Sequence, residues 1–127
     1  MKQRCATVPD APAGEIQPMS GRACQPSIYN CVEVLGAGTR VDKVKGRTAM
    51  IYPNTTKIYH FELWGRGWHH NTPDRVWEAT IRPGYVDSGW VTVNRNFPRG
   101  SGVLSRLWVK LNGRWYSEYG MACLKIT

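Results

Sequence analysis

The clearest structural signal in the chain reads Val103-Leu104-Ser105-Arg106-Leu107-Trp108-Val109-Lys110-Leu111, and Asn112-Gly113 follows it directly. From Ser105 onward, small and aliphatic side chains alternate with charged and aromatic ones, which is the period of a strand with one buried face. Asn-Gly is typical of a type I′ turn, because both central residues of that turn need a positive φ. The stretch therefore predicts a long strand that turns back into another.

The same alternation recurs along the rest of the chain. It is clear in 57–64, 75–81 and 90–94, and no segment carries a helical period over three turns. Strands are expected near 28–35, 40–51, 57–64, 75–82, 89–95, 103–111 and 114–126. Arg82-Pro83-Gly84 is expected as a turn between two of them. About seven strands without covering helices predict an all-β fold, an antiparallel β-sandwich, with a small closed barrel as the alternative.

The N-terminal stretch has a different composition. Half of the chain's 8 prolines fall within the first 26 residues, at Pro9, Pro12, Pro18 and Pro26. Proline lacks the N–H that a central strand must donate, so we interpret 1–26 as an N-terminal arm. With 127 residues there is room for one domain, which we place at 27–127 and expect to fold without the arm.

Cysteine usage indicates an oxidising compartment, and hence a secreted protein. No two of the 4 cysteines form a C-x-x-C pair, which disfavours a zinc ribbon or a thioredoxin-type site. Three disulfide pairings are open. We favour Cys31–Cys123, joining the first strand to the last, with Cys5–Cys24 bracing the arm. The alternative is four reduced thiols in a cytosolic protein.

The net charge of +8 favours an acidic partner. Nucleic acid, an anionic cell envelope and an acidic protein surface all satisfy that condition, and we expect one of the latter two. The region 88–117 carries basic residues and no acidic one. No apolar run approaches the ~20 residues that a membrane-spanning helix needs, so no membrane span is expected.

The histidines are the only candidates for acid–base chemistry. His60, His69 and His70 lie close together in the sequence, and His60 shares a strand face with Glu62. Spacing of this kind is common by chance, and no phosphate loop, nucleophile elbow or zinc triad accompanies it. We therefore expect no enzyme, no cofactor and no metal site; a basic nuclease using His60 is the alternative.

Aromatic residues beside positive charge are the candidates for binding. Trp68 lies in a polar segment, 65–73, which is expected as a loop whose tryptophan either anchors a ligand or folds back over the sandwich end. Trp90 and Trp108 fall on strand faces opposite the apolar ones, and Arg106, Trp108 and Lys110 form a basic–aromatic stripe that suits sugars or bases. The candidate binding residues, for protein or glycan, are Arg66, Trp68, His69, Trp90, Arg106, Trp108 and Lys110.

Several segments resemble a known group of proteins. These are 59–65, 71–77, 94–100 and 123–126. They are similar to small secreted actinobacterial β-sandwich proteins, and within that group the chain resembles the adaptor subunits of Streptomyces umbrella toxin particles. The resemblance covers 28–127 and transfers no individual functional residue. It implies an adaptor that inserts its N-terminal arm, here 1–26, into a cleft of a partner and so joins a spoke-bearing subunit to a lectin-carrying one.

The expected function is therefore a secreted, non-enzymatic interaction module that docks a protein partner through its arm, as a component of an extracellular toxin complex. Two alternatives stay open. One is a carbohydrate- or envelope-binding module that uses Trp68, Trp90 or Trp108 against sugar rings. The other is a secreted protease inhibitor that presents Arg4 or Arg99 as bait.

Overall fold

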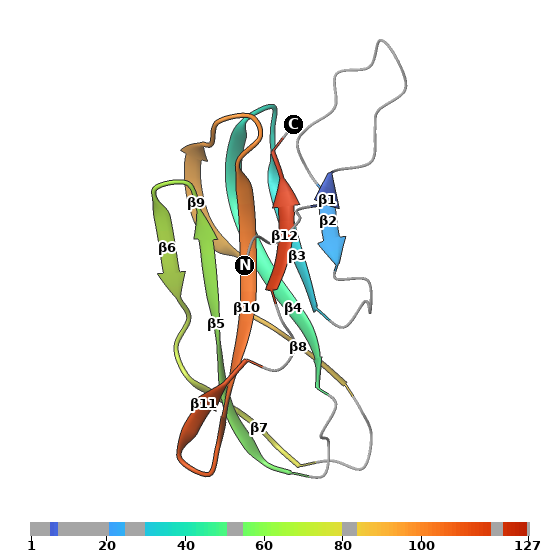
Figure 1. The fold of residues 1–127 in the computed structure, drawn as a ribbon, viewed down its shortest axis with the longest axis vertical. Helices are drawn as coiled ribbons and strands as arrows, with labels where there is room; N and C mark the ends of the chain where they lie inside the picture. Colours follow the sequence, from blue (N-terminus) through green and yellow to red (C-terminus); the bar gives the residue numbers. More distant parts are fainter. Residues whose placement is uncertain are drawn as a thin grey trace.

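The computed structural model describes residues 6–7, 21–24, 30–50, 55–79, 84–117 and 121–126. These residues form no helix and two β-sheets that pack face to face (Figure 1). The predicted all-β sandwich is confirmed. Within the described ranges, no helix has the length and apolar character needed to cross a membrane.

The first sheet is built around the long strand β10. Its order is β1-β12-β10-β5-β6, with β11 also paired to β10 and β7 also paired to β5. Each pair of neighbouring strands in this sheet is antiparallel, except that β1 and β12 run parallel to each other. The strands are β1 Ala6–Thr7, β5 Lys57–Gly65, β6 Trp68–Asn71, β7 Arg75–Trp77, β10 Gly102–Leu111, β11 Arg114–Tyr116 and β12 Met121–Lys125.

The second sheet is narrower and lies behind the first in Figure 1. Its order is β2-β3-β4-β8, with β9 paired to the other end of β4. The strands are β2 Gly21–Cys24, β3 Asn30–Ala37, β4 Arg40–Met50, β8 Gly84–Asp87 and β9 Val91–Asn96. Consecutive strands lie in different sheets at four places, β1 and β2, β4 and β5, β7 and β8, and β9 and β10, so each sheet combines strands from distant parts of the sequence.

The core lies between the two sheets and follows the alternation seen in the sequence. In β10, Val103, Ser105 and Leu107 are fully buried, and Leu104 and Arg106, which alternate with them, face outward. Val32 and Val34 of β3 and Phe61 of β5 meet them from the two layers. The inward face of each strand is thus set by its two-residue period.

The predicted hairpin after β10 is confirmed. Asn112 and Gly113 have φ values of 52° and 78°, and β11 pairs back on β10 across them. A positive φ at both positions is the requirement of the I′ turn that Asn-Gly meets at low cost. The strand expected over 114–126 is in fact two, since β11 and β12 are separate elements that pair with successive parts of β10.

Two segments expected as turn or loop contain strands. In the stretch 65–73 the chain reverses at Arg66-Gly67 and returns as β6, which pairs with β5. Gly67 has φ 69°, the left-handed conformation that a short reversal needs. Gly84, expected as the end of a turn, begins β8, which pairs with β4. Both strands are four residues long, which is too short for a two-residue alternation to be recognised in the sequence.

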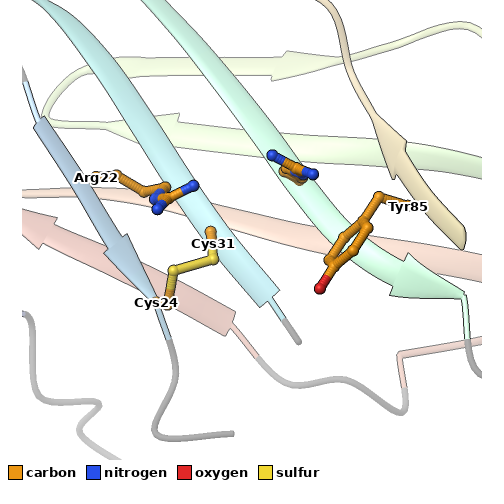
Figure 2. A pocket seen from close by; sticks show the side chains of 5 residues that line it. Arg22, Cys24, Cys31 and Tyr85 are labelled. Atoms are coloured by element: carbon orange, nitrogen blue, oxygen red, sulfur yellow. A yellow bond between two sulfur atoms is a disulfide. The ribbon is translucent and has the colours of Figure 1, made fainter. Parts of the chain in front are cut away.

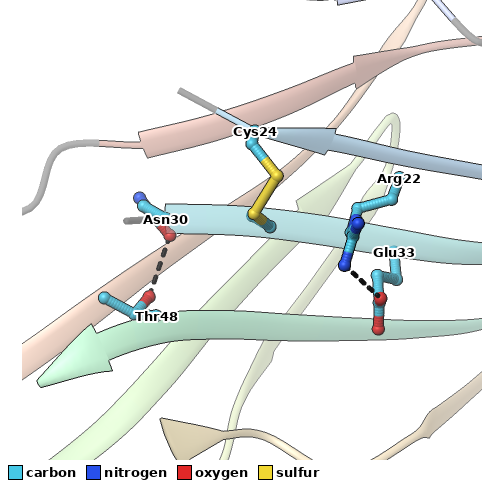
Figure 3. Close-up of a disulfide and its surroundings, with 6 residues drawn as sticks. Arg22, Cys24, Asn30, Glu33 and Thr48 are labelled. Carbon is cyan, nitrogen blue, oxygen red and sulfur yellow. Dashed lines mark hydrogen bonds and ion pairs between the residues drawn. A yellow bond between two sulfur atoms is a disulfide. The ribbon is translucent and has the colours of Figure 1, made fainter. Parts of the chain in front are cut away.

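The favoured disulfide pairing is wrong. Cys31 is bonded to Cys24, with Cα atoms 4.0 Å apart, because the two residues lie directly opposite each other in β2 and β3 (Figure 3). Cys31 is therefore not available to Cys123, which lies in β12 of the other sheet. Cys123 is also disulfide-bonded.

The observed pairing predicts the result of a non-reduced digest. Trypsin has no cleavage site between Cys24 and Cys31, so we expect one tryptic peptide that carries the bond internally. Chymotrypsin cleaves after Tyr29 and should yield two peptides that separate only on reduction. Mass spectrometry distinguishes these products. A linked pair containing Cys31 and Cys123 would contradict the structure.

The described parts of the N-terminal stretch belong to the two sheets. β1 pairs in parallel with β12, and β2 forms the edge of the second sheet beside β3. Ala23 of β2 is 4% exposed and lies in the core cluster. The rest of 1–26, where the arm was predicted, lies outside the described residues. β2 contains no proline and lies at the edge of its sheet.

Candidate functional site

The candidate site is the outward face of the first sheet, where β5 and β10 run side by side. Their alternation sends one set of side chains into the core and the other to solvent. The antiparallel register then places Glu62 opposite Arg106, and His60 opposite Trp108. We call the resulting surface the outer tryptophan face; its residues are His60, Glu62, Trp64, His69, Arg106, Trp108, Lys110 and Trp115.

Glu62 is the centre of the hydrogen bonding on this face. Its Oε1 accepts a bond of 2.8 Å from the indole Nε1 of Trp108, and its Oε2 lies 2.6 Å from Nε2 of His69. An ionised carboxylate only accepts, so Nε2 of His69 is the donor in that contact. The Glu62 side chain is 18% exposed. One carboxylate thus fixes an indole and an imidazole from two neighbouring strands.

Arg106 lies among the rings and not against a carboxylate. Its guanidinium carbon is 5.3 Å from the ring centre of Trp108 and 5.9 Å from that of Trp64. Trp64 in turn stacks on His69, with ring centres 5.6 Å apart and an interplanar angle of 29°. The Nε of Arg106 is buried without a hydrogen-bond partner among the described residues. Cation–π contact and stacking therefore orient this group.

A second cluster occupies the other end of the face. Trp115 packs edge-on against His60, with ring centres 4.5 Å apart, and Nζ of Lys110 is 5.9 Å from the Trp115 ring. Oδ1 of Asp74 is 3.1 Å from Nδ1 of His60, but the contact does not have the geometry of a hydrogen bond. Trp115 is 36% exposed.

The structure brings together only some of the residues proposed from sequence. Arg106, Trp108, Lys110 and His69 all lie on the outer tryptophan face. Trp68 does not, because the alternation of β6 turns it toward the core, where it is half-buried against the core cluster. Its ring lies parallel to that of His70, with centres 6.2 Å apart.

The two remaining candidates are separated from this face. Arg66 is exposed in the turn between β5 and β6. Trp90 is 42% exposed and sits beside the second sheet, with Nζ of Lys45 4.6 Å from its ring centre. Trp64 and Trp115 join the face although sequence reasoning did not select them. The sequence pattern places both tryptophans at outward positions of their strands. It does not show which outward residues share a surface until the neighbouring strands are known.

The chemistry available on the face is stacking and hydrogen bonding. Three indoles offer flat apolar surface, and a carboxylate, two imidazoles, a guanidinium and an amine offer polar contacts within the same area. Both oxygens of Glu62 already accept hydrogen bonds from the protein, so that carboxylate positions its neighbours. Among the described residues, no group of three or more His, Cys, Asp and Glu side chains is arranged to hold a metal ion.

Comparisons with known proteins identify no relative of this chain. Searches against protein families, curated proteins and solved structures each return no match for the chain. The resemblance to toxin-particle adaptors therefore stays a prediction. What the chain belongs to at the level of structure is the class of disulfide-braced all-β sandwiches.

Proposed function

We propose that this protein is an extracellular, non-enzymatic binding module whose outer tryptophan face recognises a carbohydrate chain. The observation that carries the proposal is the line of tryptophans along β10. Trp64 lies beside Leu104 at one end and Trp115 beside Lys110 at the other, with Trp108 between them. At about 3.4 Å per residue, the ends are ~20 Å apart, long enough for several sugar rings.

The mixture of groups on the face suits a sugar. Pyranose rings present an apolar C–H face, which stacks on indole, and an edge of hydroxyl groups, which need donors and acceptors. Arg106, His60 and Lys110 lie between or beside the tryptophans and supply those polar contacts. Because Glu62 holds the rings of Trp108 and His69 in place, less side-chain entropy is lost when a ligand binds.

The disulfides support an extracellular location. The described cysteines are all bonded, and disulfides persist in oxidising compartments. The docking element that we propose is the sheet face and not the N-terminal arm, because β1 and β2 already pair with β12 and β3. An adaptor in a toxin complex is compatible with a sugar-binding face, and a protein partner is the competing outcome of the test below.

We expect the protein to be retained by insoluble cell-wall polysaccharide and released by soluble fragments of it. Trp64→Ala and Trp115→Ala should each weaken binding at least tenfold, because truncating an anchoring aromatic residue typically costs about 2 kcal/mol. Affinity electrophoresis in polysaccharide gels measures the change. Trp90→Ala is the matched control, since this exposed tryptophan lies off the face.

The proposal fails if Trp90→Ala weakens retention as much as Trp64→Ala does, or if no polysaccharide retains the wild type. If a protein instead co-purifies stoichiometrically with the wild type but not with Trp64→Ala or Trp115→Ala, the face binds a protein partner. Trp64→Ala and Trp115→Ala should each unfold at the same temperature as the wild type, because the rings of Trp64 and Trp115 are partly exposed.

A further inference from the structure

A pocket on the opposite side of the molecule has a different chemistry. It has a volume of about 210 Å³, lies on the outward face of the second sheet and is lined by Arg22, Cys24, Cys31, Arg47 and Tyr85. Figure 2 shows Arg22 and the disulfide on one side of this pocket and Tyr85 on the other. Two guanidinium groups thus share one small depression with an apolar wall.

Strand register explains why these groups meet. Cys24 lies opposite Cys31, and Cys31 lies opposite Arg47, so the three form a row across β2, β3 and β4. Arg22 is two residues before Cys24 and therefore points to the same side of β2. The covalent bond between β2 and β3 holds Arg22 at a defined position relative to Arg47. Tyr85 enters from β8, on the far side of β4.

Arg47 carries a charge that no described carboxylate neutralises. Asp87 lies opposite it in β8, but Oδ1 of Asp87 accepts a hydrogen bond of 2.7 Å from the backbone N–H of Gly89 and forms no ion pair with Arg47. The Arg47 guanidinium instead lies over the Tyr85 ring, 4.3 Å from its centre. A guanidinium on an aromatic face keeps its N–H donors available at the edge of its plane.

Arg22 is only partly neutralised. Among the described residues its ion-pair partner is Glu33, at 3.8 Å (Figure 3). Glu33 also makes a shorter contact of 3.0 Å with Lys45. Glu33 is therefore shared between two cations, and the Arg22 side chain is 54% exposed. The pocket is left with a surplus of positive charge contributed by Arg22 and Arg47.

We propose that this pocket binds a single oxyanion group, a carboxylate or a phosphate, carried by an acidic ligand. Paired guanidinium groups match such groups because the planar fork of N–H donors pairs with two oxygens at once. The volume of about 210 Å³ suits one such group and its point of attachment. The disulfide and the Tyr85 ring provide the apolar wall against which the carbon skeleton of the ligand packs. The site is independent of the outer tryptophan face.

The test is a titration of the intact, oxidised protein with inorganic phosphate, with glucuronate and with glucose, at constant low ionic strength. Nuclear magnetic resonance of the arginine Nε–H groups reports binding residue by residue. We expect saturable shifts at Arg22 and Arg47 with either anion and none with glucose. The anion that binds more tightly identifies the source of the oxyanion as a phosphorylated or an acidic-sugar ligand.

Variants separate this pocket from general surface charge. Arg47→Gln and Arg22→Gln should each weaken phosphate binding about tenfold, the effect of losing one charge-assisted hydrogen-bonding group. Arg47→Lys keeps the charge without the fork and should fall between wild type and Arg47→Gln. Arg40→Gln is the matched control on the same strand, because its partner Asp42 lies 3.3 Å away and the pair is outside the pocket.

The proposal is overturned if neither anion gives saturable shifts, or if Arg40→Gln reduces binding as much as Arg47→Gln does. It is also overturned if Arg47→Gln and Arg22→Gln bind phosphate like the wild type. Trp64→Ala should leave phosphate binding unchanged, so that failure at one site is distinguishable from failure at the other. A thermal melt of each glutamine variant checks that the loss is not a loss of folding.

Discussion

Replacing Gly46 with alanine is expected to lower the free energy of unfolding by about 3 kcal/mol or more, at the upper end of overpacking in a closed core. Gly46 lies on the inward side of β4, against side chains of the other sheet. A Cβ atom there would overlap Oγ of Ser105 and come within 2.7 Å of Cδ1 of Phe61. Both neighbours are completely buried, so neither has solvent to move into.

Backbone bonds prevent β4 from moving away. The N–H of Gly46 donates to Oγ of Ser88, and its carbonyl accepts from the N–H of Ser88, both at 2.9 Å. A shift of the strand to make room for a methyl group would break these contacts. Urea-induced unfolding followed by tryptophan fluorescence measures the change in stability.

Two further variants identify the cause of this effect. Ser105→Ala should be nearly neutral alone, because Oγ of Ser105 has no hydrogen-bond partner among the described residues, and should partly rescue Gly46→Ala. Gly38→Ala is the control: Gly38 has φ 58° in open space, so only about 1–2 kcal/mol of backbone strain is expected. Equal effects of Gly38→Ala and Gly46→Ala would refute the steric explanation.

Removing residues 1–26 is expected to abolish the single cooperative melt of the domain. The deletion takes away β2, the edge partner of β3, together with the Cys24–Cys31 bond and the buried Ala23. The disulfide closes a loop of sequence separation 7, for which the chain-entropy model gives about 2–3 kcal/mol. Loss of β2 adds the unpaired N–H and C=O groups of β3 and newly exposed core. This expectation reverses the one drawn from the proline content.

Calorimetry should compare the deleted chain with full-length protein carrying Cys24→Ser and Cys31→Ser. In the deleted chain Cys31 and Cys123 are changed to serine as well, so that no new disulfide forms. We expect the serine pair alone to melt at a lower temperature but still cooperatively, and the deletion to show no cooperative transition. A deleted chain that melts like the intact protein would restore the interpretation of 1–26 as a separable arm.

Local patterns predicted the fold class because its main signals are short-range. The alternation in β10 and the Asn112-Gly113 turn depend on pleating and on allowed φ values, which neighbouring residues set by themselves. The outward stripe of Arg106, Trp108 and Lys110 follows from the same period. The short strands β6 and β8 were not predicted from the sequence. Each has four residues and forms a strand because a longer neighbour, β5 or β4, pairs with it.

The sequence by itself determined that the chain is all-β, which faces of its long strands are buried, and that cysteines brace it. The tertiary structure alone decided which strands are neighbours, and with that the bond between Cys24 and Cys31, the contact of Glu62 with Trp108 and the meeting of Arg22 with Arg47. The physical reason is that side-chain period is a property of one strand, whereas pairing and register depend on the burial and closure of the whole sandwich. Both proposed sites consist of residues from different strands, so they exist only once those strands are paired.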